Sequence, residues 1–125
     1  MNATMILNRA EELREELIEN RRTLHSYAET GFDLPQTTAF VEKKLREYGL
    51  TPVRCGKAGI TCVIGDPKKG KCFLLRGDMD ALPIFEESGE VFASEVPGKM
   101  HGCGHDMHTA MMLGAAKLMK EHEEE

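Results

Sequence analysis

The 125-residue sequence has no apolar run of transmembrane length, no basic cluster and no export signal. No run of Lys or Arg exceeds two residues and the net charge is −5, which argues against nucleic acid or an anionic membrane as a partner. Residues 1–8 lack the basic start and the apolar stretch of a signal peptide. We therefore expect a cytoplasmic protein that does not contact a membrane.

Several motifs that would indicate other classes of protein are also absent. There is no glycine-rich phosphate loop, no GxSxG motif, no internal repeat and no CxxC pair. The four cysteines, Cys55, Cys62, Cys72 and Cys103, are not expected to form disulfides in a reducing compartment. Cys103 is the one with histidines beside it. A hydrophobic content of 41% is ordinary for a globular protein, and the length suits one domain.

The order of hydrophobic patterns predicts an α/β fold with the elements ααβββα. A helix is expected over residues 4–26, where apolar side chains recur at helical spacing, and a second helix from Pro35 to Gly49. His25, near the end of the first helix, is interpreted as a structural histidine with its hydrogen bonds satisfied. Strands are expected at 51–54, 60–64 and 71–76, the last two forming a hairpin across the turn-rich residues 65–70.

The third predicted strand indicates a layered structure. Residues 72–75 are apolar at successive positions, which is typical of a strand covered on both faces. A last helix is expected to follow, with Asp106 as its N-cap. Gly114 and Ala115 on that helix predict a close approach to a sheet. The pattern therefore favours part of a mixed sheet flanked by helices.

The segment 100–108 carries the densest chemistry, with three histidines, one cysteine and one aspartate. Cys103 and His105 are two residues apart with glycines beside them, so an extended backbone would point both side chains the same way. A thiolate and an imidazole suit zinc and similar transition metals. We interpret the segment as half of a metal site, and the alternative is a glycine-rich turn with solvated histidines.

Two aspartates after the third predicted strand form a second candidate site. Asp78 and Asp80 lie where a strand is expected to end, and ligands of open α/β sheets gather beyond such ends. The alternative interpretation is a turn in which the aspartates cap backbone groups. The long connection over residues 84–99 has little periodicity, which is typical of a loop that borders a site.

Residues 75–83 and 100–110 resemble the signatures of metal-dependent N-acyl-amino-acid amidohydrolases, a group that includes aminoacylases, hippurate hydrolase and the hydrolases of indole-acetic-acid–amino-acid conjugates. Residues 22–32 and 114–118 also resemble that group. The resemblance implies a catalytic domain with two divalent metal ions (Mn, Zn, Co or Ni) and a smaller inserted domain used for homodimerisation. The substrate would be the amide bond of an N-acyl amino acid.

The resemblance also implies roles for particular residues. Cys103 and His105 match metal ligands, and Asp80 matches an aspartate that supports a ligand from behind, while Asp78 and His108 are left without a role. The family's general base, a glutamate that follows a strand, and its later ligands have no counterpart here. Residues 1–125 are therefore expected to be the N-terminal part of such a catalytic domain, without a second domain, and to be inactive alone.

Two other functions are open from the residues. A thiol hydrolase would use Cys103 as nucleophile with His105 or His108 as base, but such enzymes usually take their histidine from a distant part of the sequence. A non-catalytic metal-binding or interaction fragment is the other alternative, because the general base is missing.

Overall fold

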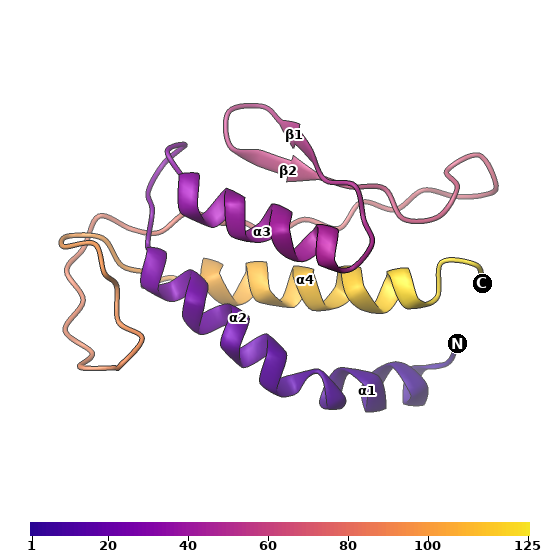
Figure 1. Ribbon diagram of the computed structural model, residues 1–125, viewed down its shortest axis with the longest axis horizontal. Coiled ribbons are helices and arrows are strands. Elements are labelled where there is room, and N and C mark those ends of the chain that lie inside the picture. Colours follow the sequence, from indigo (N-terminus) through magenta and orange to yellow (C-terminus); the bar gives the residue numbers. More distant parts are fainter.

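The computed structural model describes all residues 1–125 and contains helices and one small sheet (Figure 1). The elements, in order, are α1 (Ala3–Glu12), α2 (Arg14–Tyr27), α3 (Pro35–Glu47), β1 (Val53–Cys55), β2 (Gly59–Thr61) and α4 (His105–Glu121). None of these helices combines the length and the apolar character that a membrane crossing requires. The mixed α and β class is thus confirmed, with a smaller sheet than predicted.

The helix predicted over residues 4–26 is present but changes direction at Leu13. Helical hydrogen bonds continue through this point, from Leu13 N to Arg9 O (3.1 Å) and from Leu17 N to Leu13 O (2.9 Å). Leu13 is 5% exposed, so the bend turns an apolar side chain inward. As a result, α1 and α2 run at an angle to each other along α4 (Figure 1).

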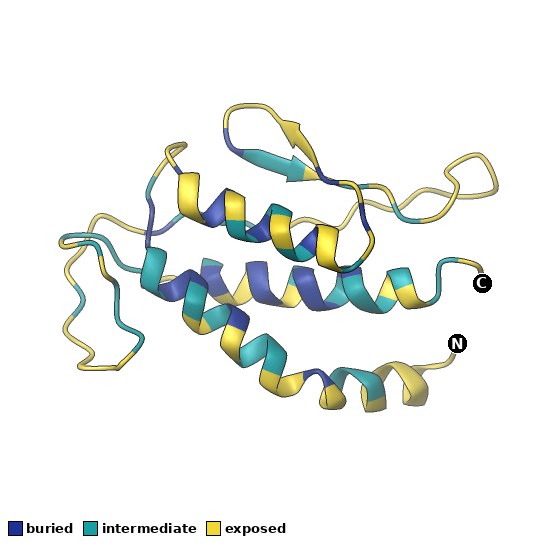
Figure 2. Cartoon of the chain, in the orientation of Figure 1, coloured by how far each residue is buried: buried dark blue, intermediate teal, exposed yellow.

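The core lies between α2, α3 and α4 (Figure 2). It consists of Leu24, Val41, Leu45, Leu50, Ala110, Leu113 and Ala116. Gly114 allows the close contact between α4 and α2, because a Cβ at that position would lie 2.7 Å from Leu17 Cδ2. The expectation that Gly114 faces a sheet is therefore wrong, since its neighbour is a helix.

The predicted hairpin forms one connection earlier than expected. β1 pairs antiparallel with β2, with Val53 opposite Thr61 and Cys55 opposite Gly59. Gly56 makes the turn possible with a φ of +62°, a conformation that side chains disfavour. Gly59 is needed as well, because a Cβ there would meet the Cys55 carbonyl oxygen at 2.6 Å.

The strand predicted at residues 71–76 is absent. Phe73 is 83% exposed and Leu74 is 88% exposed, and the segment is extended without a ladder partner. A strand that is apolar on both faces requires neighbours and cover, because its backbone groups and side chains are otherwise left in water. Residues 1–125 do not supply these neighbours, so the prediction is wrong for this chain.

An ion pair and a hydrogen bond at the partly exposed edge of the core join α2 to α4 and to Tyr48, the residue that follows α3. Lys117 Nζ lies 2.6 Å from Glu16 Oε2, and the Tyr48 hydroxyl donates to Glu16 Oε1 at 2.7 Å. Burial opposes ionisation of Glu16, but the hydrogen bonds from Lys117 and Tyr48 outweigh it and lower the pKa of Glu16. The carboxylate is therefore favoured in the folded state.

This pair predicts a loss of stability in acid. Because the folded-state pKa of Glu16 is depressed, its contribution is present above its unfolded pKa, near 4.3, and is lost as pH falls through the folded value. We expect Glu16→Gln to cost about 1 kcal/mol at neutral pH and to flatten the pH dependence. Urea denaturation at neutral and acidic pH would measure this. Glu19→Gln, at an exposed site on the same helix, is the control, and an unchanged pH profile in Glu16→Gln would contradict the prediction.

Candidate metal centre

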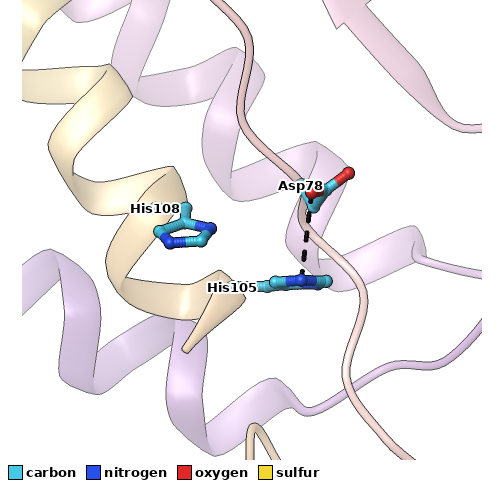
Figure 3. Close-up of side chains that lie close together, drawn as sticks. All are labelled: Asp78, His105 and His108. Atoms are coloured by element: carbon cyan, nitrogen blue, oxygen red, sulfur yellow. Dashed lines mark ion pairs between the residues drawn. The ribbon is translucent and has the colours of Figure 1, made fainter. Parts of the chain in front are cut away.

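Three possible metal ligands meet where the extended segment around Asp78 passes the first turn of α4 (Figure 3). One ligand atom each from Asp78, His105 and His108 lies within 4.8 Å of the others. His105 Nε2 is 3.8 Å from Asp78 Oδ2, the contact drawn in Figure 3. His105 and His108 are three residues apart on one helix face, and their ring centroids are 5.6 Å apart.

Asp80 holds the other side of the His105 ring. His105 Nδ1 lies 3.0 Å from Asp80 Oδ1 and 3.0 Å from the Asp80 carbonyl oxygen. Both oxygens are acceptors, so Nδ1 donates to them, and Nε2 is the ring nitrogen on the side of Asp78. A carboxylate behind a histidine in this way fixes the ring and raises its basicity as a ligand. The arrangement suits the orienting role predicted for Asp80, which stays a prediction.

Backbone contacts fix the aspartate segment against α4. Ala81 N donates to Glu29 O at 2.7 Å, and Leu82 pairs with Met100 in both directions at 2.9 and 3.0 Å. The Thr109 hydroxyl donates to the Asp78 carbonyl oxygen at 2.9 Å. These contacts place residues 78–80 beside the beginning of α4, although the strand predicted before them is absent.

The beginning of α4 differs from the prediction. Its N-cap is Gly104, with φ +106°, and no side chain caps the helix. Asp106 lies inside the first turn, and its buried carboxylate contacts His25 and Arg21 instead of backbone N–H groups. The prediction that Asp106 is the N-cap is therefore wrong. The prediction failed because the charge-assisted contacts of Asp106 with the buried His25 and the partly exposed Arg21 stabilise its carboxylate more than capping would.

Cys103 is not part of the three-residue group. It is exposed, and its sulfur is not among the ligand atoms that converge with His105. The left-handed φ of Gly104 interrupts the extended backbone on which the same-side argument depended. The pairing of Cys103 with His105 as metal ligands stays a prediction from the resemblance. No histidine is hydrogen-bonded to Cys103, so the thiol-hydrolase alternative gains no support.

Asp78 is engaged by an arginine. Arg76 donates to its two carboxylate oxygens at 3.2 and 2.5 Å, and the Arg76 side chain is 73% exposed. An exposed pair of this kind is weak and can share or yield the carboxylate to a cation. No role was predicted for His108, although its spacing of three residues from His105 indicates that both lie on one helix face.

The three side chains fit a divalent transition metal by their chemistry. Two imidazoles and one carboxylate are donors that suit Zn, Mn, Co or Ni. Asp80 supplies the hydrogen bond that such histidine ligands require from behind. The group is half-exposed, so a small ion can reach it from solvent.

Comparison with known proteins shows that the chain is similar to peptidases and amidohydrolases. Residues 74–125, which include every candidate ligand, match peptidase family M20/M25/M40. The chain is 45% identical over 114 residues to an N-acetyl-L-cysteine deacetylase of Bacillus subtilis (strain 168) and 41% identical over 112 residues to an N-acyl-L-amino acid amidohydrolase of Geobacillus stearothermophilus. These alignments cover 90% and 89% of this chain.

The fold agrees with the sequence match. A Bacillus subtilis structure described as a dinuclear metal binding peptidase from the M20 family superimposes with a TM-score of 0.84, at 36% identity over 90% of this chain. The predicted resemblance to the N-acyl-amino-acid amidohydrolases is thus confirmed, and the chain is similar to an M20 peptidase in sequence and in fold.

The relatives are longer than this chain. It spans 27% and 30% of the two hydrolases and 32% of the M20 structure. A Rhodococcus jostii (strain RHA1) protein named as a glutamate–cysteine ligase is 43% identical over 122 residues, which is 15% of its length. The activities named here therefore belong to these longer proteins, and for this chain an activity can only be proposed.

Proposed function

We propose that this chain forms part of the metal centre of an amidohydrolase that releases amino acids from N-acyl amino acids. The observation that carries the proposal is the 45% identity to an N-acetyl-L-cysteine deacetylase along 90% of the chain. The supporting geometry is the convergence of Asp78, His105 and His108, with Asp80 behind His105. We further propose that residues 1–125 are an N-terminal part of the catalytic domain.

The side chains of this segment would bind and orient. His105 would offer Nε2 to a metal, because its Nδ1 donates a hydrogen bond to Asp80. Cys103 would contribute a thiolate after a change at Gly104, or Asp78 and His108 would complete the ligand set as they stand. Bound divalent ions would supply Lewis acidity toward an amide carbonyl. The general base and the remaining ligands are expected outside residues 1–125.

A chimera tests the activity directly. Residues 1–125 would replace the corresponding segment of the Bacillus subtilis deacetylase, and amino-acid release from N-acetyl substrates would be measured. We expect turnover that a chelator abolishes and that Mn²⁺, Zn²⁺, Co²⁺ or Ni²⁺ restores, and the preferred ion identifies the metal. The 125-residue chain alone is the control and is expected to be inactive. A folded, metal-loaded chimera without turnover would contradict the proposal, as would chelator-sensitive turnover by the isolated chain.

A second function, metal binding without catalysis, is favoured by one observation. The three possible ligands Asp78, His105 and His108 all belong to this chain and lie close together without any residue from elsewhere. If the isolated chain binds one divalent ion and the chimera does not turn over, this second function would replace the first. Localisation in the cytoplasm and dimerisation through a separate domain are further proposals that depend on the complete protein.

A further inference from the structure

The buried side chain of His25 lies between two carboxylates from distant parts of the chain. Its Nδ1 is 2.7 Å from Asp106 Oδ2 on α4, and its Nε2 is 2.9 Å from Glu86 Oε1 on the loop 84–99. The side chains of His25, Glu86 and Asp106 are 4%, 4% and 0% exposed. Phe92 packs edge-on against the imidazole, with ring centroids 5.5 Å apart. Water is therefore largely excluded from both contacts.

Both carboxylates already accept other hydrogen bonds. Ser94 N donates to Glu86 Oε1 at 2.9 Å, and the Ser88 hydroxyl donates to Glu86 Oε2. Arg21 Nε donates to Asp106 Oδ2 at 2.8 Å. Each of these oxygens accepts an N–H, which favours the ionised, acceptor-only form of both carboxylates. Both nitrogens of His25 then face acceptors, and this geometry favours a proton on each of them.

The surrounding charges are consistent with this arrangement. Burial opposes ionisation of Glu86, but the hydrogen bonds from Ser88, Ser94 and His25 outweigh it and lower the pKa of Glu86. Arg21 and a doubly protonated His25 would balance Asp106 and Glu86, which a buried ionic cluster requires.

The outer neighbours of the imidazole complete its surroundings. Arg22 lies over the Phe92 ring at 4.9 Å, and the His101 ring is 6.1 Å from His25. Both ring nitrogens of His101 are buried and have no hydrogen-bond partner.

The cluster acts on the first turn of α4. That helix has no side-chain cap, so its beginning depends on the contacts of Asp106 and His105. Consecutive helical residues project about 100° apart, and here Asp106 contacts α2 while His105 contacts Asp80. Holding Asp106 therefore fixes the rotation of the turn that carries His105.

We propose that His25 is a positioning residue that donates from both ring nitrogens, to Asp106 and to Glu86. It joins α2, the loop 84–99 and the first turn of α4, and it thereby sets the direction of His105 toward Asp80 and Asp78. Only the importance of this direction for a metal rests on the proposed function. The protonation of His25 and the placement of His105 can be tested whether or not the chain binds a metal.

Nitrogen NMR of the complete chain with labelled histidines tests the proposal without any metal. At neutral pH and with a chelator present, we expect both His25 nitrogens to show protonated-type shifts and His105 to show a proton on Nδ1. In His25→Gln, which can donate to one carboxylate only, we expect the His105 Nδ1 signal to move. His122→Gln, near the C-terminus, is the matched control and is expected to leave His105 unchanged. A neutral His25 tautomer in the unmodified chain would overturn the proposal, as would an unmoved His105 signal in His25→Gln.

Two further measurements keep the test decisive. Glu86→Ala leaves the contact between α2 and α4 in place, so the chain is expected to fold even if His25→Gln does not. The imidazole of Glu86→Ala is expected to lose its Nε2 proton, and retention of both protons would overturn the proposal. In a Co²⁺ titration, His25→Gln is expected to bind about tenfold more weakly with unchanged helix content. Equal affinities would remove the positioning role, whereas no binding by any form would reject the proposed metal function and leave the NMR result standing.

Discussion

Replacing His105 with alanine is expected to weaken Co²⁺ binding by about 100-fold. This is the upper end of the range for losing a residue that is hydrogen-bonded behind a ligand, and His105 would itself be a ligand. His105 belongs both to the pair predicted from the motif, with Cys103, and to the group found in the structure, with Asp78 and His108. No alternative ligand set in this segment omits it. A titration followed by visible absorption would measure the affinity, and an unchanged affinity would reject both ligand sets.

Two companion substitutions separate the two ligand sets. If Cys103 is a ligand, Cys103→Ser removes the sulfur-to-cobalt absorption band and weakens binding, while His108→Ala has little effect. If Asp78, His105 and His108 hold the ion as the structure arranges them, His108→Ala weakens binding and Cys103→Ser has little effect. His122→Ala is the control, because His122 lies at the end of α4 and pairs with Glu125. Its affinity is expected to equal that of the unmodified chain.

Local signals explain which helices and turns could be predicted. α3 begins at Pro35, whose fixed φ suits the first turn, and ends before Gly49, whose φ is +79°. Each signal acts within a few residues, so the sequence suffices. The segment 71–76 is different, because a two-sided apolar strand depends on partners that no local pattern reports. The hairpin was misplaced for the same reason, since two plausible turns competed and only the packing of β2 against α3 decides between them.

The candidate site divides in the same way. The resemblance between motifs predicted that Asp80 supports a metal ligand but did not name that ligand, and the structure places Asp80 against His105. The position of Cys103 depended on one glycine, because an extended backbone and a left-handed one point the same side chain in different directions. His25 was correctly expected to have its hydrogen bonds satisfied, but its partners could not be named. Glu86 lies in a loop without periodicity, 61 positions away in sequence.

Replacing Leu24 with alanine is expected to lower the free energy of unfolding by about 3 kcal/mol, because the substitution removes buried methyl groups and leaves a cavity. Leu24 is 1% exposed and packs in the cluster that joins α2, α3 and α4. Single domains are stable by about 5–15 kcal/mol, so a large share of the total would be lost. Urea denaturation followed by circular dichroism would measure the change.

The matched control is Leu7→Ala on α1, where the same atoms are removed from a side chain that is 69% exposed. Its effect is expected to stay within about 0.5 kcal/mol. Equal costs at the two positions would mean that the three-helix core is not what stabilises residues 1–125. Because Leu24 precedes His25, Leu24→Ala is also expected to loosen the contact between His25 and Asp106. Nitrogen NMR should then detect a shifted His105 Nδ1 signal in Leu24→Ala and an unchanged signal in Leu7→Ala. That result would show that the geometry of the candidate metal centre depends on the packing of the core.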